Sequence, residues 1–279
     1  MSLLLQTPRA VCRRLLRPGA ASPLQDRVVL VTGASSGIGA ATARLVAAHG
    51  ATTLLVARRA ETIAALADEL VAAGGRAAAY PCDLTDGDAV DALVARVLAD
   101  HGSVDYLVNN AGRSIRRSLA ASHDRFHDFE RTMAINYFGP VRLTMGLLPA
   151  MREQRFGHVV NIVSWGVQLK APRFAAYLAS KSALDTWARV AARETWDDNV
   201  TFTNMRFGLV HTPMVETTVE HYRRWPSLTA DQAAARVLRA LEDRPVSFNV
   251  AAGRAGDVLN LVTPRLADFV MHRLDRSGS

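Results

Sequence analysis

Short apolar runs rich in β-branched residues alternate along the chain with longer stretches whose apolar residues recur at helical spacing. Such short runs predict buried strands, and we expect seven of them, at 27–32, 51–57, 76–81, 104–108, 158–163, 200–207 and 245–251. Helices are predicted between the strands, at 40–49, 61–73, 86–100, 128–154 and 174–195. Alternating strands and helices form right-handed βαβ units. The fold class is therefore α/β: a doubly wound, Rossmann-like parallel sheet of about seven strands with helices on both faces.

Two terminal segments fall outside this alternation, so we divide the chain into an N-terminal extension (1–25), a central α/β domain (26–253) and a C-terminal helical extension (254–279). The first is a basic amphipathic segment. Its arginines lie on one arc of a short helix and apolar residues lie on the other: Arg9, Arg13, Arg14 and Arg17 against Val11, Cys12, Leu15 and Leu16. Such a helix can bind an anionic membrane surface or serve as an organelle transit peptide. A disordered or core-packed terminus is the other alternative.

The C-terminal extension predicts two helices, split at Thr263-Pro264, with an apolar stripe on each. The stripe residues are Val258, Leu259, Leu261 and Val262, and then Leu266, Phe269, Val270 and Leu274. Amphipathic helices normally turn such a stripe toward a core or another subunit. Together with the basic N-terminal helix, the stripe makes peripheral membrane contact through the termini an alternative.

Composition limits the function classes that fit the chain. Its 279 residues carry 33 basic and 26 acidic side chains, a net charge of +7, but aromatic residues make up only 6% and no nucleic-acid-binding motif is present. Two cysteines are too few for a disulfide framework and fit a reducing cytoplasm. No apolar run reaches the roughly 18 residues that a membrane span needs, and neither the cysteines nor the pair His123 and His127 indicates a metal site. We expect a cytoplasmic protein, with membrane association through the termini as the alternative, and with neither a metal nor a nucleic-acid partner.

A glycine-rich turn links the first predicted strand to the first predicted helix. It reads Gly33-Ala-Ser35-Ser36-Gly37-Ile38-Gly39, with the spacing G-x-x-x-G-x-G. Backbone N–H groups at such a helix start can bind a phosphate, and glycine lets the backbone approach the ligand closely. The position between a strand and a helix predicts a dinucleotide phosphate site.

The second predicted strand ends in Arg58-Arg59, with no acid before Glu61. In a dinucleotide-binding fold this strand end faces the adenosine ribose, where an acid favours NAD and an arginine accommodates the 2′-phosphate of NADP. Two solvated arginines are the alternative explanation, but cations are poorly placed at a helix N-terminus. The pair therefore favours NADP over NAD.

Other candidate ligand-binding residues also follow predicted strands. Asp83-Leu84 follows the third strand, Asn109-Asn110-Ala111-Gly112 follows the fourth, and Ser164 ends the fifth. Ligands of parallel sheets bind beyond the carboxyl ends of the strands. We therefore expect these residues to gather with Gly33 and Arg58 at one edge of the sheet.

Tyr177 and Lys181 lie four residues apart in a predicted helix and therefore share one face of it. A free tyrosine has a pKa of about 10, and a nearby cation lowers it, which suits a phenol for proton exchange with a carbonyl/alcohol pair. The chain contains only two lysines, Lys170 and Lys181. Because arginine is otherwise preferred, the lysine here indicates a need for a compact ammonium.

Taken together and in order, these motifs resemble those of the short-chain dehydrogenase/reductase family. The matching residues are Thr32-Gly33-Ala-Ser-Ser-Gly37-Ile-Gly39, Asp83-Leu84, Asn109-Asn110-Ala111-Gly112, Asn136, Ser164 and Tyr177-x-x-x-Lys181. The resemblance covers about 26–253 and implies a dinucleotide-binding and catalytic domain that transfers hydride to or from a carbonyl/alcohol carbon. It implies that Tyr177 is the general acid in reduction and that Ser164 polarises the substrate oxygen. Lys181 would bind the nicotinamide ribose and lower the pKa of Tyr177, and Asn136 would hold a water that relays protons.

The same resemblance implies a set of cofactor-binding residues. They are Gly33, Ser35, Ser36, Gly37, Ile38, Gly39, Arg58, Arg59, Asp83, Leu84, Asn110, Ala111, Gly112, Tyr177, Lys181, Gly208, Val210 and Thr212. The chain departs from the family pattern at Phe207, where a proline usually precedes Gly208. This departure concerns the stiffness of the turn and removes no catalytic group.

The family's substrate pocket is lined by three variable loops, here 113–117, 165–173 and 214–226, all of which carry apolar residues. Such a lining favours a lipophilic carbonyl substrate, for example a 3-oxoacyl chain reduced to a secondary alcohol. Oxidation of a hydrophobic secondary alcohol, such as a steroid, is one alternative, and a non-catalytic dinucleotide sensor is another. The family also implies a homodimer or homotetramer that pairs the helices 128–154 and 174–195.

Overall fold

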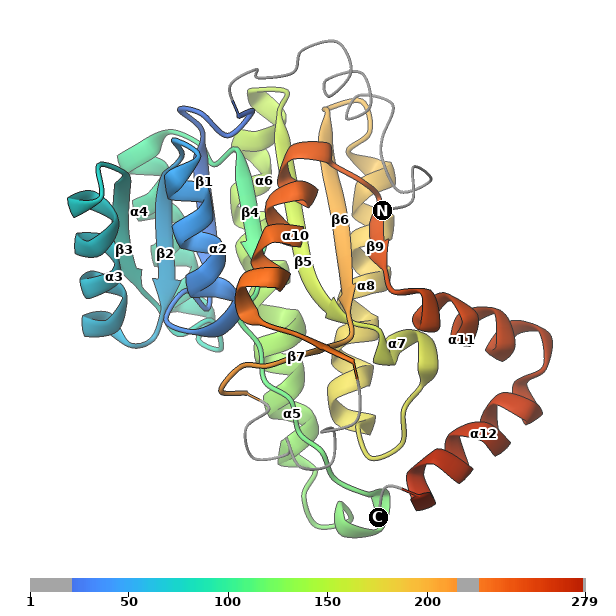
Figure 1. Ribbon diagram of the computed structural model, residues 1–279. Coiled ribbons are helices and arrows are strands. Elements are labelled where there is room, and N and C mark those ends of the chain that lie inside the picture. Colours follow the sequence, from blue (N-terminus) through green and yellow to red (C-terminus); the bar gives the residue numbers. More distant parts are fainter. Residues whose placement is uncertain (1–21, 215–225, 278–279) are drawn as a thin grey trace.

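The computed structural model describes residues 22–214 and 226–277, and one parallel sheet forms its centre (Figure 1). The seven strands are β1 (Val28–Thr32), β2 (Thr52–Ala57), β3 (Arg76–Pro81), β4 (Tyr106–Asn109), β5 (Gly157–Ser164), β6 (Val200–Phe207) and β9 (Ser247–Asn249). They lie in the order β3-β2-β1-β4-β5-β6-β9, and each neighbouring pair is parallel. The predicted doubly wound α/β fold is confirmed.

The pleat of the strands sends alternate side chains into two separate cores. In β1, Val29 and Val31 belong to the core formed with α2 (Gly37–Ala48), α3 (Ala60–Ala72) and α10 (Ala230–Asp243). Leu30 belongs to the core formed with α4 (Gly87–His101), α6 (Gly139–Glu153) and α8 (Ala175–Glu194). Because β1 is covered on both faces, its sequence is a continuous apolar run without polar alternation.

The long helix expected at 128–154 is divided into three consecutive helical segments. α5 (His127–Met133) passes into a π-helical turn at Ala134–Phe138 before α6 begins. The sequence does not reveal this turn, because the apolar spacing on each side of it remains helical. Asn136 lies within the π turn and is fully buried, and such turns are frequent at functional sites.

Two further differences from the predictions lie near the C-terminus. α10 was not predicted, although Thr229 and Gln232 form a capping box: Thr229 Oγ1 accepts from Gln232 N at 3.2 Å, and Gln232 Oε1 accepts from Thr229 N at 3.1 Å. The strand expected at 245–251 is shorter, since β9 pairs only with β6 and over three residues. Ala251 instead begins α11 (Ala251–Val262), which is followed by α12 (Pro264–Ser277).

Shorter elements connect these parts: η2 (Leu119–Ala121), α7 (Gly166–Leu169) and the parallel pair β7 (Leu209–Val210) and β8 (Ser227–Leu228). The amphipathic helix expected within 1–25 and most of the loop 214–226 lie outside the described residues. Within 22–214 and 226–277, no helix combines the length and apolar character required to cross a membrane.

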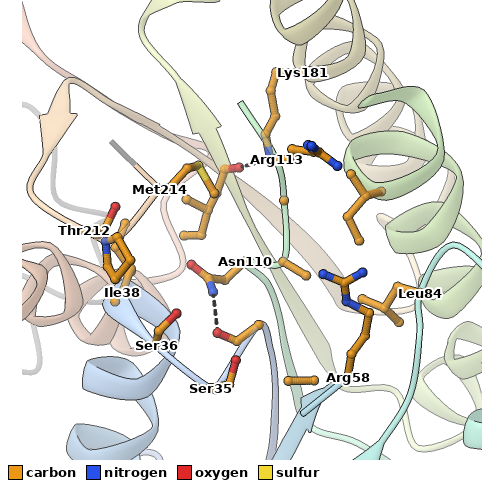
Figure 2. A pocket seen from close by; sticks show the side chains of 18 of the residues that line it. Ser35, Ser36, Ile38, Arg58, Leu84, Asn110, Arg113, Lys181, Thr212 and Met214 are labelled. Atoms are coloured by element: carbon orange, nitrogen blue, oxygen red, sulfur yellow. Dashed lines mark hydrogen bonds between the residues drawn. The ribbon is translucent and has the colours of Figure 1, made fainter. Parts of the chain in front are cut away.

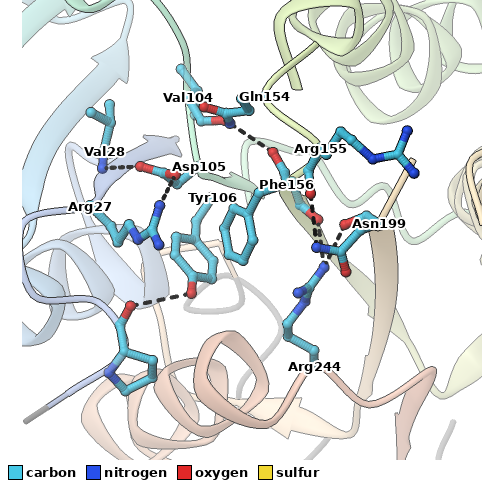
Figure 3. A network of polar contacts seen from close by, with 12 residues as sticks. Arg27, Val28, Val104, Asp105, Tyr106, Gln154, Arg155, Phe156, Asn199 and Arg244 are labelled. Carbon is cyan, nitrogen blue, oxygen red and sulfur yellow. Dashed lines mark hydrogen bonds and ion pairs between the residues drawn. The ribbon is translucent and has the colours of Figure 1, made fainter. Parts of the chain in front are cut away.

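A polar and aromatic network covers the amino-terminal edge of the sheet (Figure 3). Asp105 accepts hydrogen bonds from Arg27 Nη1 and from the backbone N of Val28, both at 2.9 Å. The guanidinium carbons of Arg27 and Arg244 lie 4.8 and 4.7 Å from the centre of the Phe156 ring. This edge is therefore packed, and the large cavity of the molecule lies at the opposite, carboxyl edge.

Candidate active site

A cavity of about 1060 Å³ opens at the carboxyl ends of the strands (Figure 2). Most of the predicted site residues line it: Gly33, Ser35, Ser36, Gly37, Ile38, Arg58, Arg59, Leu84, Asn110, Ala111, Gly112, Ser164, Tyr177, Lys181, Gly208, Val210 and Thr212. Gly39, Asp83 and Asn136 do not line it. The sheet thus brings residues from widely separated motifs to one edge, as expected for ligand sites of parallel sheets.

The glycine-rich turn between β1 and α2 leaves room for a ligand against the backbone. Gly33 and Gly37 have positive φ angles of 66° and 54°, which side chains rarely adopt. A Cβ on Gly39 would collide with the Gly33 carbonyl, so Gly39 lets the helix start pack against the turn. Ser36 makes no side-chain cap hydrogen bond, and the first turn of α2 carries no acid. This open helix start fits the phosphates of a nicotinamide dinucleotide.

Thr32, at the end of β1, fixes the turn to the end of β4. Its Oγ1 donates to the Val108 carbonyl and accepts from the backbone N–H groups of Asn110 and Ala111, both at 3.0 Å. Asn110 Nδ2 donates back to the Thr32 carbonyl at 2.9 Å. No role was predicted for Thr32, although a hydroxyl at a buried strand end beside a glycine-rich turn is a usable signal.

Arg58 and Arg59 lie at the end of the cavity beside the glycine-rich turn. Arg59 Nη2 donates to Ser35 Oγ at 3.0 Å, and Arg58 Nη1 lies 3.9 Å from Asp83 Oδ2. Burial opposes ionisation of Asp83, but hydrogen bonds from Thr85 and the charge of Arg58 lower its pKa below the ordinary value. Asp83 is therefore a charged partner of Arg58 and does not line the cavity itself.

Ser164, Tyr177 and Lys181 meet from two elements on one wall of the cavity. Ser164 ends β5, and its hydroxyl hydrogen-bonds Tyr177 of α8. Lys181, one turn further along α8, donates from Nζ to the Ile162 carbonyl at 2.8 Å. Figure 2 shows Lys181 and Arg113 at the opposite end of the cavity from Arg58 and Ser35, with Asn110 between them.

Burial sets the acid–base properties of this wall. It raises the pKa of Tyr177 to about 12, and the hydrogen bond from Ser164 opposes the rise. Burial also lowers the pKa of Lys181 to about 8. Burial is the larger of the two causes that act on Tyr177, and the lowering of its pKa by Lys181 stays a prediction. Tyr177 is protonated at neutral pH, which is the state that a proton donor requires.

Asn136 lies behind the cavity and holds the backbone that follows Gly112. Its Nδ2 donates to the Arg113 carbonyl and to Ser180 Oγ, and its Oδ1 accepts from Arg113 N, all at 2.9 Å. A Cβ on Gly112 would lie 2.8 Å from Asn136 Oδ1 and 3.3 Å from Lys181 Nζ. Both amide protons are thus in use, and a water could bond only to the remaining lone pair of Oδ1. The relay role stays a prediction, and the geometry adds a positioning role.

The loops expected to line the substrate pocket divide between two cavities. Arg113 and Met214, from the first and third loops, line the large cavity. The second loop instead contributes to a cavity of about 500 Å³, lined by Ser118, Leu119, Gly166, Val167, Lys170, Ala171, Pro172, Arg173, Ala175, Leu178, Ala179, Ser182 and Asp275. In the chain, Leu178 of this second cavity directly follows Tyr177, and Gly166 lies two residues after Ser164.

A comparison with protein-family models shows the family to which the chain belongs. The model described as short chain dehydrogenase matches residues 27–223, well over half of the chain. The chain belongs to the short-chain dehydrogenase/reductase family. The resemblance carried by the separated motifs is therefore confirmed, and this short-chain dehydrogenase/reductase is an NAD(P)-dependent oxidoreductase.

Individual relatives of this short-chain dehydrogenase/reductase are similar over most of its length. An uncharacterized oxidoreductase of Mycobacterium tuberculosis is 48% identical, covering 90% of this chain and 74% of the relative. A fatty acyl-CoA reductase of Acinetobacter baylyi is 43% identical, covering 89% and 84%. The crystal structure of a metagenomic short-chain oxidoreductase in complex with NADP is 32% identical, with a TM-score of 0.70, and covers 81% of this chain and 97% of that one.

Proposed function

We propose that this oxidoreductase uses NADPH to reduce the carbonyl carbon of a lipophilic acyl substrate. The observation that carries the proposal is the placement of Ser164, Tyr177 and Lys181 on one wall of a cavity whose far end carries the glycine-rich turn and Arg58-Arg59. A dinucleotide that spans the cavity would thus have its phosphates at the turn and its nicotinamide beside Tyr177.

The chemistry that a bound NADPH supplies is hydride transfer to the carbonyl carbon. The balancing proton goes to the carbonyl oxygen, and Tyr177 Oη is the proposed donor. Ser164 is within hydrogen-bonding reach of the Tyr177 hydroxyl and would hold the same substrate oxygen as negative charge develops. Lys181 would bind the nicotinamide ribose, and its charge would stabilise the phenolate left after proton transfer.

The preference for NADPH rests on charge at the ribose end of the cavity. Arg58 and Arg59 both line it, and arginine at the end of this strand accommodates a 2′-phosphate. The similar metagenomic oxidoreductase was crystallised with NADP. These two observations support NADPH over NADH.

The substrate class is proposed from the A. baylyi relative, a fatty acyl-CoA reductase. A hydride and a proton added to an acyl thioester give a thiohemiacetal, whose C–S bond breaks to release an aldehyde and a thiol. A 3-oxoacyl chain, the substrate favoured by the sequence, is the second candidate, because its ketone needs only the same hydride and proton. Both candidates use the same wall and differ in whether a leaving group departs.

The proposal is tested by following NADPH and NADH oxidation with chain-length series of acyl-CoA and 3-oxoacyl-CoA substrates, and by identifying the product. We expect faster turnover with NADPH, a rate that rises with chain length, and aldehyde from the acyl-CoA series. Tyr177→Phe should lower kcat by about 10²–10⁴-fold, with a much smaller effect on NADPH affinity.

Tyr137→Phe is the matched control, since no hydrogen bond from the Tyr137 hydroxyl is found within the described ranges. NADPH binding without turnover of any carbonyl would favour the sensor alternative. Turnover confined to secondary alcohols with NADP would favour the dehydrogenase alternative.

We further propose that the protein is a cytoplasmic homodimer or homotetramer. Exposed apolar side chains on and beside α6 and α8 support the oligomer: Met145 and Val190 lie within the two helices, Phe138 directly precedes α6, and Trp196 lies two residues beyond α8. If these helices pair between subunits, Met145→Glu should reduce the mass measured by light scattering. An unchanged mass in that variant would place the subunit contact elsewhere.

A further inference from the structure

The C-terminal arm, defined as α11 and α12, carries an unusual share of the exposed apolar surface. Six of its large apolar side chains are exposed: Val258, Leu261, Val262, Leu266, Phe269 and Leu274. The exposure is greatest where the two helices meet, with Leu261 at 85% and Val262 at 69%. A soluble surface normally scatters such residues singly, so this cluster indicates a contact with an apolar partner.

The arm is attached to the catalytic domain by its polar inner face. Gln168 of α7 donates to Asp257 Oδ2 at 2.5 Å and accepts from Asn260 Nδ2, through its backbone carbonyl, at 3.0 Å. Arg173 Nε lies 2.7 Å from Asp275 Oδ1. The arm therefore has a defined orientation: its polar contacts and the small buried residues Gly256 and Ala267 face inward, and its exposed large apolar side chains face outward.

The charged side chains of the arm are also divided between its two sides, with arginines beside the exposed apolar residues and acids elsewhere. On α11, Arg254 lies on the arc of Val258 and Leu261, and this outward arc carries no acid. On α12, the guanidinium carbon of Arg273 lies 5.2 Å from the centre of the exposed Phe269 ring. The acids Asp257 and Asp275 are engaged by the inner contacts, and Asp268 lies on the far side of α12 from Leu266 by helical spacing. Apolar side chains interspersed with arginine complement an anionic lipid surface.

We propose that the C-terminal arm docks on an anionic lipid bilayer, with the junction of α11 and α12 inserted at the headgroup boundary. The two helices have 12 and 14 residues, fewer than the roughly 20 needed to span a bilayer, so the arm lies in the interface. Figure 1 shows the arm extending away from the sheet beyond β9.

Docking through the arm would also orient the catalytic cavity. α11 packs on α7, which begins two residues after Ser164, and Ser164 Oγ accepts from Gly166 N at 3.1 Å. The arm is thus connected through one short helix to the catalytic wall. A bilayer that holds the arm would lie beside the carboxyl edge of the sheet, where a lipophilic substrate has to enter.

The test is co-sedimentation of the full chain with vesicles of phosphatidylcholine, with and without phosphatidylglycerol. The variant is Leu261→Asp combined with Val262→Asp, both far from the cavity wall. The matched control is Val71→Asp, because Val71 is an exposed valine on α3. NADPH affinity of each variant verifies that the catalytic domain is folded, and light scattering gives the oligomeric mass.

We expect the wild type and the Val71→Asp variant to bind the anionic vesicles. The double variant should bind them about tenfold or more weakly, with unchanged NADPH affinity, because it replaces two apolar contacts by charges. Equal binding by the double variant would overturn the proposal and assign vesicle binding to another segment. Absence of vesicle binding by the wild type would also overturn it. If, in addition, the oligomeric mass falls in the double variant, another copy of the chain covers the arm. None of these outcomes depends on which carbonyl is reduced.

Discussion

At the residue scale, two buried threonines on neighbouring strands are expected to contribute to stability in opposite ways. The Thr32 hydroxyl accepts two backbone N–H groups and donates to a carbonyl. The Thr53 hydroxyl is equally buried and has no hydrogen-bond partner in the described part of the chain. Burying the Thr53 hydroxyl without a hydrogen-bond partner is unfavourable. Removing the Thr32 hydroxyl, in contrast, would leave buried backbone groups without their partner.

We therefore expect Thr32→Val to lower the free energy of unfolding by about 1–3 kcal/mol and to weaken NADPH binding, because Asn110 and Ala111 lose their acceptor. Thr53→Val should leave the free energy unchanged or raise it. Denaturant unfolding and NADPH titration of both variants measure this. Equal losses of unfolding free energy in the two variants would show that the hydrogen bonds of Thr32 to the end of β4 contribute nothing to stability.

The two lysines allow a second prediction at this scale, on the pH dependence of reduction. Burial lowers the pKa of Lys181 to about 8, so its charge is lost as pH rises through that value. The kcat for reduction should fall over the same range, because the phenolate of Tyr177 loses its stabilising cation. A kcat profile between about pH 6 and 10 measures it. Lys170→Met should keep the inflection, and a profile flat through pH 8 would contradict the prediction.

At the element scale, the π turn between α5 and α6 positions Asn136 and, through it, the loop after β4. The Asn136 side chain makes three hydrogen bonds at 2.9 Å, two of them to the backbone of Arg113. A regular α-helical turn at this place would shift the register of every residue that follows. The turn thus couples the helix to the cavity wall at Gly112.

Asn136→Ala should lower the free energy of unfolding by about 2–4 kcal/mol, because it leaves buried partners unsatisfied. If Asn136 also relays protons, kcat should fall in this variant more than it does in Ser180→Ala, which removes only one of the three bonds. Unfolding and steady-state rates measured in parallel separate the two roles. Equal effects on kcat would assign Asn136 a positioning role alone.

At the scale of the whole molecule, the packed amino-terminal edge contains a titration that links stability to pH. His158 is fully buried, and its Nδ1 lies 2.7 Å from Thr201 Oγ1. Burial, and then the charge of Arg244, lower the pKa of His158 to about 3. An unfolded histidine titrates at about 6.5, so between these values the unfolded state binds more protons than the folded state.

The free energy of unfolding should therefore fall as pH drops from about 6.5 toward 3, by up to about 1.4 kcal/mol per pH unit from this residue. His158→Gln should flatten that part of the profile, and the slope, not the absolute stability, is the quantity to compare. His123→Gln, at an exposed position, is the control. A parallel profile for His158→Gln would assign the acid sensitivity to other groups.

The predicted strands and helices agree with the structure in some parts of the chain and miss elements in others. β3 and β6 have the predicted bounds, because both are bounded by residues that end strands and helices locally. α10 was missed although Ala233, Val237 and Leu241 recur at helical spacing, because most of its buried face is alanine and the capping box at Thr229 was overlooked. The π turn was missed because its hydrogen-bond shift leaves no compositional trace.

The sequence by itself determined the α/β alternation, the glycine-rich turn and the order of Ser164, Tyr177 and Lys181. These features depend on local backbone preferences and on the rule that parallel strands present their carboxyl ends to one edge. Only the tertiary structure decided that Asn136 holds Arg113, that Thr32 joins the ends of two strands, and that burial raises the pKa of Tyr177. Burial and hydrogen-bond partners come from segments that meet only in the folded chain, so no local pattern contains them. The outward apolar face of α11 and α12 depends on both the sequence and the tertiary structure. Its periodicity is in the sequence, and its exposure is decided by which side of the arm packs on α7.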